Sequence, residues 1–313
     1  MDMKKKFLLL LFAFISFCNA QNSQELTKPT GSYLGQEPPG DEPEIFAPGF
    51  ISKHGRYEFC GSFSPDGKEF YYSVSQKDWS NNRILVTKII NEEWSEPSVV
   101  RFSGFDVDWS VFLSNDGKKL FFSSGRPIQS WNLDMWMSER IDNNWSEPVK
   151  MKINTSRSDF PGTTTEGGTL YFSSRFEKKG SVGILRSRLI NNDYVASEKL
   201  PFPINTDNEM DGSPFISPDE SFLLFSSQRE GSAGDDIFIC FRNKDDSWTD
   251  AYNLGKKINT DRNESLPILS PDGKYLFFTR GDGPNVQNRE IDIYWVSSSV
   301  IDSIRQSLSL ENK

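Results

Sequence analysis

One ten-residue frame recurs five times along this chain, and its spacing limits the folds that the sequence can adopt. Each copy begins with an acidic residue and ends nine positions later in a tight-turn sequence. The copies are EFCGSFSPDG (58–67), DWSVFLSNDG (108–117), DFPGTTTEGG (159–168), DGSPFISPDE (211–220) and ESLPILSPDG (264–273). Their first residues lie 50, 51, 52 and 53 positions apart. A period of this length indicates a solenoid, a propeller or an array of units.

Each copy of the frame also predicts a β-hairpin. Its final Pro-Asp-Gly, Asn-Asp-Gly or Glu-Gly-Gly supplies the positive-φ positions of a hairpin turn. An aromatic run follows every turn: EFYYSVS (69–75), KLFFSSG (119–125), TLYFSSR (169–175), SFLLFSS (221–227) and YLFFTRG (275–281). A third apolar strand comes next in each repeat, and a short outer strand follows around Trp94, Trp145, Tyr194 and Trp248. Four short strands per repeat are typical of the blades of a β-propeller.

The ends of the repeat region predict how the propeller closes. Blades are expected at 57–105, 106–156, 157–207, 208–261 and 262–300, and the fifth has no outer strand of its own. Phe46-Ala47-Pro48 lies ahead of the first frame, as Pro97 and Pro148 lie ahead of later ones, so segment 44–52 is expected to complete the last blade. We predict an all-β, single propeller of five blades, with six blades as the alternative. A linker at 21–43 and a tail at 301–313, with a short helix at 301–310, flank it.

The first 20 residues predict a secretory signal. Lys4, Lys5 and Lys6 precede an apolar run at 7–17, and Cys18-Asn19-Ala20 gives a cleavage site before Gln21. The run is too short to span a bilayer, and no later segment is apolar for long enough. Phe17 argues against acylation of Cys18, because a lipoprotein signal needs a small residue there. We expect an exported protein, periplasmic or extracellular, without a membrane span.

Composition excludes several kinds of site. The net charge of −9 argues against nucleic acid and anionic membrane surfaces as partners. His54 is the single histidine, which disfavours a Ser-His-Asp site and a histidine-based zinc site. Cys60 and Cys240, which remain after cleavage, fall in repeats one and four, so no disulfide is expected. We expect no cofactor and no metal.

The Ser-Pro-Asp-Gly turns, the Leu-Phe-Phe-Ser-Ser runs and the Asp-Ile-Tyr strands resemble the TolB-like class of WD40-like propellers. Ile-Asn-Thr, used at 153–155, 204–206 and 258–260, is similar to exported bacterial members of that class. The resemblance covers nearly all of the chain after residue 20. It implies the propeller fold and, for most members, a role as an interaction platform. TolB itself is similar to a six-bladed propeller with an added N-terminal α/β domain, so we do not expect its specific partners here.

The repeated acids and a set of basic residues are predicted to meet. The acids that open the first strands are Glu58, Asp108, Asp159, Asp211 and Glu264. The basic residues that end the second strands are Lys77, Arg126, Arg175, Arg229 and Arg280. These positions are adjacent in an antiparallel hairpin, so a carboxylate and a guanidinium placed there can pair bidentately, within a blade or across to the neighbouring blade. Asp134, Asp236 and Asp292 open three third strands and could join these networks.

Two interpretations of the acid ring remain open. The first is that the pairs fasten the blades, which their presence in every repeat favours. The second is that carboxylates at the channel mouth hold a cation or act on a sugar, as a glycosidase needs two acids. An arginine partner lowers the pKa of a carboxyl group, which disfavours a general acid.

Aromatic residues near the acids predict a binding surface. Trp79, Trp131 and Phe176 fall in loops between second and third strands, beside Trp109 and Phe160. With Arg126 and Arg175 they could form a protein-binding hot spot or stack on sugars. We predict a non-catalytic, exported propeller that binds a protein of the bacterial cell envelope as a scaffold. The alternative is a glycan-binding or glycan-hydrolysing propeller that uses the channel-mouth carboxylates.

Overall fold

A computed structural model describes residues 28–311, apart from 105–106, 129, 177–180, 208–209, 284–285 and 288. The expected signal peptide and its cleavage site lie outside these described residues.

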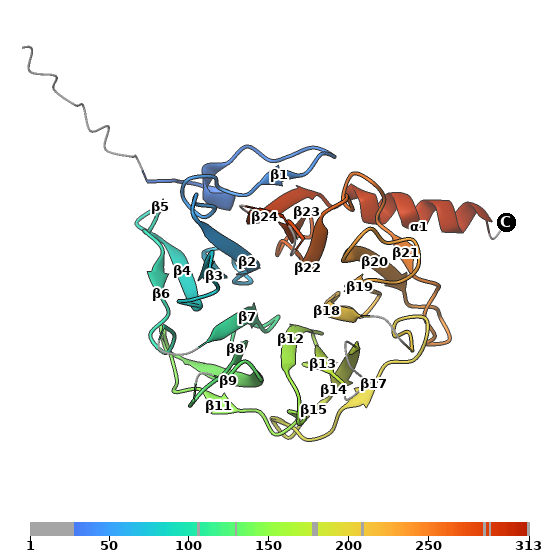
Figure 1. The fold of residues 1–313 in the computed structure, drawn as a ribbon, viewed down its shortest axis with the longest axis horizontal. Helices are drawn as coiled ribbons and strands as arrows, with labels where there is room; N and C mark the ends of the chain where they lie inside the picture. The colour runs from blue at the N-terminus through green and yellow to red at the C-terminus, as the bar shows by residue number, and fades with distance from the viewer. Residues whose placement is uncertain are drawn as a thin grey trace, which may run out of the picture.

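Five antiparallel sheets surround a central axis, which confirms the prediction of a five-bladed propeller (Figure 1). Blade 1 comprises β2 (Arg56–Phe63), β3 (Glu69–Gln76), β4 (Arg83–Ile90), β5 (Glu93–Trp94) and β6 (Ser98–Val99). Blade 2 comprises β7 (Asp108–Leu113), β8 (Lys119–Ser124), β9 (Asp134–Ile141), β10 (Asn144–Trp145) and β11 (Val149–Lys150). Blade 3 comprises β12 (Asp159–Thr164), β13 (Leu170–Arg175), β14 (Val182–Ser187) and β17 (Glu198–Lys199), with a side hairpin of β15 (Leu189–Ile190) and β16 (Asp193–Tyr194). Blade 4 comprises β18 (Asp211–Ile216), β19 (Phe222–Ser227), β20 (Asp236–Phe241) and β21 (Tyr252–Asn253).

Blade 5 is completed by the N-terminal segment, as predicted. It comprises β22 (Asn263–Leu269), β23 (Tyr275–Gly281), β24 (Ile291–Ser297) and, as its outer strand, β1 (Glu44–Ile45). Glu44 lies opposite Trp295 in this pairing, and Figure 1 shows β1 beside β24. Phe46, which follows β1, is fully buried, and its ring centroid lies 5.0 Å from that of Phe277 and 5.2 Å from that of Phe70. One phenylalanine thus joins the first blade to the last.

Residues 28–43, expected as a linker, also pack on the propeller. They include the short 3-10 turn η1 (Ser32–Gly35), in which Leu34 is buried. Trp94 of blade 1 donates its indole N–H to the Gly31 carbonyl at 2.8 Å. Tyr33 packs against Tyr275 of blade 5, with ring centroids 5.1 Å apart, so the segment contacts both blades at their junction.

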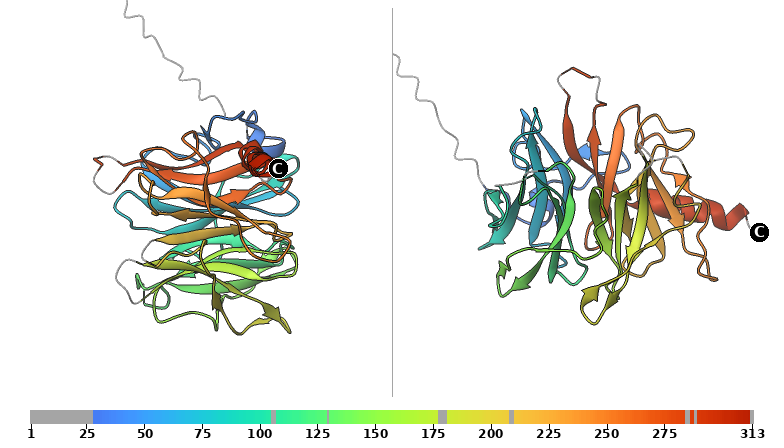
Figure 2. Two further views of the ribbon diagram at one scale, coloured as in Figure 1. Left: turned by 90° about the vertical axis from the view of Figure 1, so that its right-hand side faces the viewer. Right: turned by 60° about the horizontal axis from the view of Figure 1, so that its bottom comes forward.

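The C-terminal tail forms α1 (Ser299–Glu311), which lies at the rim of the disc (Figure 2). Ile301 is buried, and Arg305 stacks over the rings of Phe222 and Phe241 of blade 4 at 5.8 and 4.9 Å. Among the described residues, no helix has the length and apolar character needed to cross a lipid bilayer.

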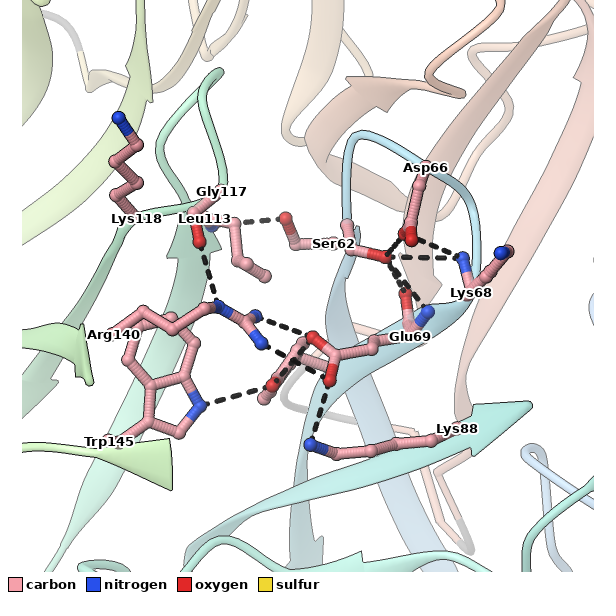
Figure 3. A network of polar contacts seen from close by, with 12 residues as sticks. Ser62, Asp66, Lys68, Glu69, Lys88, Leu113, Gly117, Lys118, Arg140 and Trp145 are labelled. Carbon is pink, nitrogen blue, oxygen red and sulfur yellow. Dashed lines mark hydrogen bonds and ion pairs between the residues drawn. The ribbon is translucent and has the colours of Figure 1, made fainter. Parts of the chain in front are cut away.

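A polar network ties blade 1 to blade 2 on the face of the hairpin turns (Figure 3). Arg140 of β9 reaches across to Glu69 of β3 at 2.5 Å and donates to the Gly117 carbonyl at 3.0 Å. Lys88 holds the same carboxylate at 2.7 Å, and Arg140 also stacks on Trp145 at 4.5 Å. These contacts join blades 1 and 2 on the face of the hairpin turns, and the ring acids begin at the opposite face.

We expect Phe46→Ala to destabilise the propeller strongly. The substitution leaves a cavity between the first and last blades, and truncating a buried phenylalanine costs about 3–5 kcal/mol of unfolding free energy. Ile90→Ala, at a side chain that is 57% exposed, is the matched control and should change the free energy by under about 0.5 kcal/mol. Urea denaturation followed by tryptophan fluorescence measures both. Equal, small effects would show that the N-terminal segment does not close the ring.

Candidate functional site

The five ring acids are all fully buried. In three blades each acid pairs with the basic residue that ends the second strand, as predicted. Arg126 lies 2.8 Å from Asp108, Arg229 lies 2.9 Å from Asp211, and Arg280 lies 2.8 Å from Glu264. These carboxylates are thus held inside the blades.

Each of these arginines also holds the loop that leads into its blade. Arg229 donates to the Pro203 and Ile204 carbonyls at 3.1 and 2.8 Å, and Arg126 donates to the Phe102 carbonyl at 3.0 Å. The ion pairs run through Nη2 of Arg126 and Arg229 and through Nε of Arg280. The guanidinium divides its donors between the acid and the backbone of the loop, which fastens three chain segments at once.

The Ile-Asn-Thr segments supply the remaining partners of the acids. Their isoleucines are buried, and each asparagine pairs with a third strand as a backbone group would: Asn205 accepts from the Ile184 amide at 2.7 Å and donates to the Ile184 carbonyl at 2.8 Å. The threonine that follows caps the acid, because the Thr206 amide and hydroxyl both donate to Asp211 at 2.7 Å. The motif is therefore a structural clamp.

Blades 1 and 3 depart from this arrangement. Glu58 pairs with Arg56 and not with Lys77, which instead pairs with Glu290 at 2.7 Å. Side chains two positions apart on a strand share a face, so Arg56 reaches Glu58 directly. Asp159 is capped by the Thr155 amide at 2.7 Å, and no ion pair joins it to Arg175 within the described ranges. The expectation of five equivalent pairs is wrong for these two blades.

The two unusual acids carry raised pKa values. Burial raises the pKa of Glu58 to about 7, although Arg56 and the Lys53 amide oppose the shift. The nearby charge of Asp292 acts in the same direction as burial. Burial likewise raises the pKa of Asp159. Neither carboxyl group is exposed, so we expect the raised pKa values to affect the pH dependence of stability and not a reaction with a ligand.

A cavity of about 360 Å³ lies at the acid-side mouth of the channel. One wall consists of aromatic side chains, Phe59, Trp79, Trp109 and Phe160, and Arg175 stacks over Phe160 at 6.0 Å. Its lining also includes small side chains: Ser110, Ser173, Gly212, Ser213, Ser226, Ser265 and Thr279. Asp235 is the one carboxylate that the described residues contribute to its wall, and burial raises the pKa of this residue.

The one-sided wall follows from the second position of the repeated frame. Blades 1 to 3 place Phe59, Trp109 and Phe160 there, whereas blades 4 and 5 place Gly212 and Ser265. A register shift follows this position directly in four inner strands and one residue later, after Pro161, in blade 3. Such bulges bend a strand and redirect side chains. The repeats thus agree at the acid and differ at the neighbouring position, which leaves space on one side.

The other predicted site residues lie in different surroundings. Trp131 is 56% exposed, and its ring is perpendicular to that of Trp109 with centroids 5.9 Å apart. Arg126 faces away from the cavity, between the rings of Phe122 and Trp136 at 5.0 and 5.5 Å.

Phe176 also lies away from the cavity. It packs within blade 3, where a Cβ on Gly183 would come within 2.4 Å of its ring. Phe59 and Asp235 belong to the cavity wall but were not predicted. The position of Phe59, second in its frame like Trp109, was the signal that could have found it.

No protein-family model matches the sequence, and no curated protein is similar to it in sequence. Several solved structures share the fold. TolB of Agrobacterium tumefaciens is 15% identical, with a TM-score of 0.52 over 78% of each chain. TolB of Acinetobacter baumannii is 16% identical, with a TM-score of 0.51 over 77% of this chain and 54% of that one. An α-L-arabinofuranosidase of Lactobacillus brevis is 12% identical, with a TM-score of 0.52 over 75% and 89%.

The likeness to the TolB structures supports the predicted resemblance. The chain has a TolB-like propeller fold. At these identities the likeness concerns the fold alone, and the same fold serves a glycoside hydrolase.

Glu58 should make stability depend on pH. Its pKa is raised from 4.5 to about 7 on folding, so between these values the folded protein binds more protons than the unfolded chain. The unfolding free energy therefore falls as the pH rises through this window, by on the order of 3 kcal/mol for this group. Urea denaturation from about pH 5 to pH 8 measures the slope.

Glu58→Gln stays neutral and should reduce that slope. Some slope should remain, because burial and the charge of Glu290 also raise the pKa of Asp292. The same pH dependence in both proteins would contradict a buried, proton-binding Glu58.

Proposed function

We propose that this chain is an exported, non-catalytic propeller that binds a protein of the bacterial cell envelope at the acid-side mouth of its channel. The observation that carries the proposal is the burial of the ring acids. All five are fully buried and none lines the cavity. Glycoside hydrolysis needs two carboxyl groups that flank the scissile bond. Among the described residues Asp235 is the one carboxylate on the cavity wall, which favours binding over hydrolysis.

The acid-side mouth has the chemistry of a binding hot spot. Trp131 and Ile128, in the loop between β8 and β9, are 56% and 80% exposed, and Trp131 contacts Trp109 of the aromatic wall. Trp79, on the same wall, is contacted by Arg289, whose guanidinium lies 5.7 Å from its ring. Tryptophan and arginine at the centre of a surface, next to a pocket, are the residues that carry most binding energy in protein interfaces. The N-terminal basic and apolar run supports export.

Glycan binding is the second candidate, and the aromatic wall favours it. Trp109 and Phe160 could stack on a sugar ring while Arg175 and the serine hydroxyls donate to its oxygens. The indole N–H of Trp109 has no acceptor among the described residues, so a ligand oxygen could fill that role. This candidate uses the same cavity, and the experiment below separates the two.

Trp131→Ala should weaken partner binding. The chain from residue 21 onward would be immobilised, exposed to the envelope fraction of its own bacterium, and tested in parallel on a glycan array. We expect one dominant protein to be captured, and truncating a hot-spot tryptophan to weaken its affinity at least about tenfold. Ile141→Ala is the matched control, because Ile141 is 60% exposed at the opposite end of β9.

Two results would contradict protein binding at this mouth. One is saturable binding to a glycan that is lost in Trp109→Ala, with no protein captured. The other is equal weakening by Trp131→Ala and Ile141→Ala, which would place the interface elsewhere.

A further inference from the structure

The aspartates that open third strands have different partners in different blades. In blade 2, Lys150 of the outer strand lies 2.7 Å from Asp134. In the strand register Lys150 is opposite Trp136, and Trp136 lies two positions after Asp134. In blade 4, Asn253 is opposite Phe238, two positions after Asp236. Blade 4 therefore repeats the aspartate of blade 2 but replaces its lysine with an asparagine.

This replacement leaves Asp236 incompletely satisfied. Asn253 donates to Asp236 Oδ2 at 2.8 Å, while Oδ1 accepts no hydrogen bond from any described residue. The side chain is only 4% exposed. A buried carboxylate oxygen without a partner is costly, and more so than a neutral group because it carries charge.

Asp236 lies on the wall of a second groove of about 500 Å³, separate from the cavity at the channel mouth. Glu230 and Asp261 line it as well, and Lys256 is the one cation among its described lining residues, which together carry a net charge of −2 (three carboxylates against one lysine). Lys256 is exposed and forms no ion pair with the described carboxylates. Arg229, which stacks on Phe238 at 5.0 Å, is already paired with Asp211.

The kind of cation follows from the groups present. In the described part of the chain no three acidic, histidine or cysteine groups are placed to hold a metal ion. Blade 2 shows what the equivalent position accepts, since a lysine ammonium on its aliphatic arm fills it there. We propose that the blade 4 groove binds a primary ammonium group on an aliphatic arm, with Asp236 as its acceptor. This site does not depend on what binds at the channel mouth.

An NMR titration of the whole chain tests this site with two probes. Butylammonium represents a free amine, and Nα-acetyl-lysine methylamide represents the lysine of a partner protein. Both should bind saturably and shift the amide signals of β20 and β21, whereas tetramethylammonium, which cannot donate a hydrogen bond, should not. Tighter binding of the lysine derivative identifies a protein side chain as the natural ligand, and equal or weaker binding identifies a free amine.

Two variants of the chain link the binding to Asp236. Asp236→Asn removes the charge and should weaken binding about tenfold or more, the effect of losing one charge-assisted hydrogen bond. Asn253→Lys restores the blade 2 arrangement and should block the groove while keeping the carboxylate. If Asp236→Asn does not fold, this variant alone tests whether the ammonium group binds at Asp236. Lys256→Met removes the competing cation and should strengthen binding. The proposal is overturned if neither wild type nor Lys256→Met binds the primary ammonium probes, or if Asn253→Lys binds them as wild type does.

Discussion

The buried carboxylate at the start of an inner strand is the contact on which the architecture of each blade depends. In blade 4, Asp211 accepts from Ser227 at the end of the second strand, from Arg229 just after it and from Thr206 of the preceding loop. A charge with no exposure to solvent is tolerable only when it is paired and hydrogen-bonded, so its burial requires all of these partners to be in place. Because these partners come from different segments, their contacts with the carboxylate fix the positions of the inner strand, its hairpin partner and the connection from the previous blade.

This use of the repeated residues determines where function can reside. A residue that every blade needs for its own assembly is not free to act on a ligand. The cavity exists because blades 4 and 5 have Gly212 and Ser265 where the other blades have aromatic rings. The groove in blade 4 exists beside an aspartate whose lysine partner is missing. Both candidate sites are therefore departures from the repeat and not copies of it.

The repeat made the fold predictable, because its period, its turns and its outer strand borrowed from the N-terminus all follow from local sequence. It also predicted the three arginine pairs, which lie within single hairpins. The repeat did not predict the ion pairs of blade 1. Lys77 pairs with Glu290, 213 positions away along the chain, and Glu58 pairs with Arg56. The inward packing of Phe176 depends on the space that Gly183 leaves. The cavity could have been suspected from the second position of the frames, where Gly212 and Ser265 replace aromatic residues, but its shape and its contact with Asp235 depend on the packing of distant segments.

The central claim is that the ring acids fasten the blades and do not act on a ligand. A double-mutant cycle on Asp211→Asn and Arg229→Met, with unfolding free energy and partner affinity measured on each variant, tests it most directly. We predict a coupling energy on the order of 2–3 kcal/mol in stability, with partner affinity unchanged in every variant that folds. A coupling near zero, together with lost binding in variants as stable as wild type, would contradict the account.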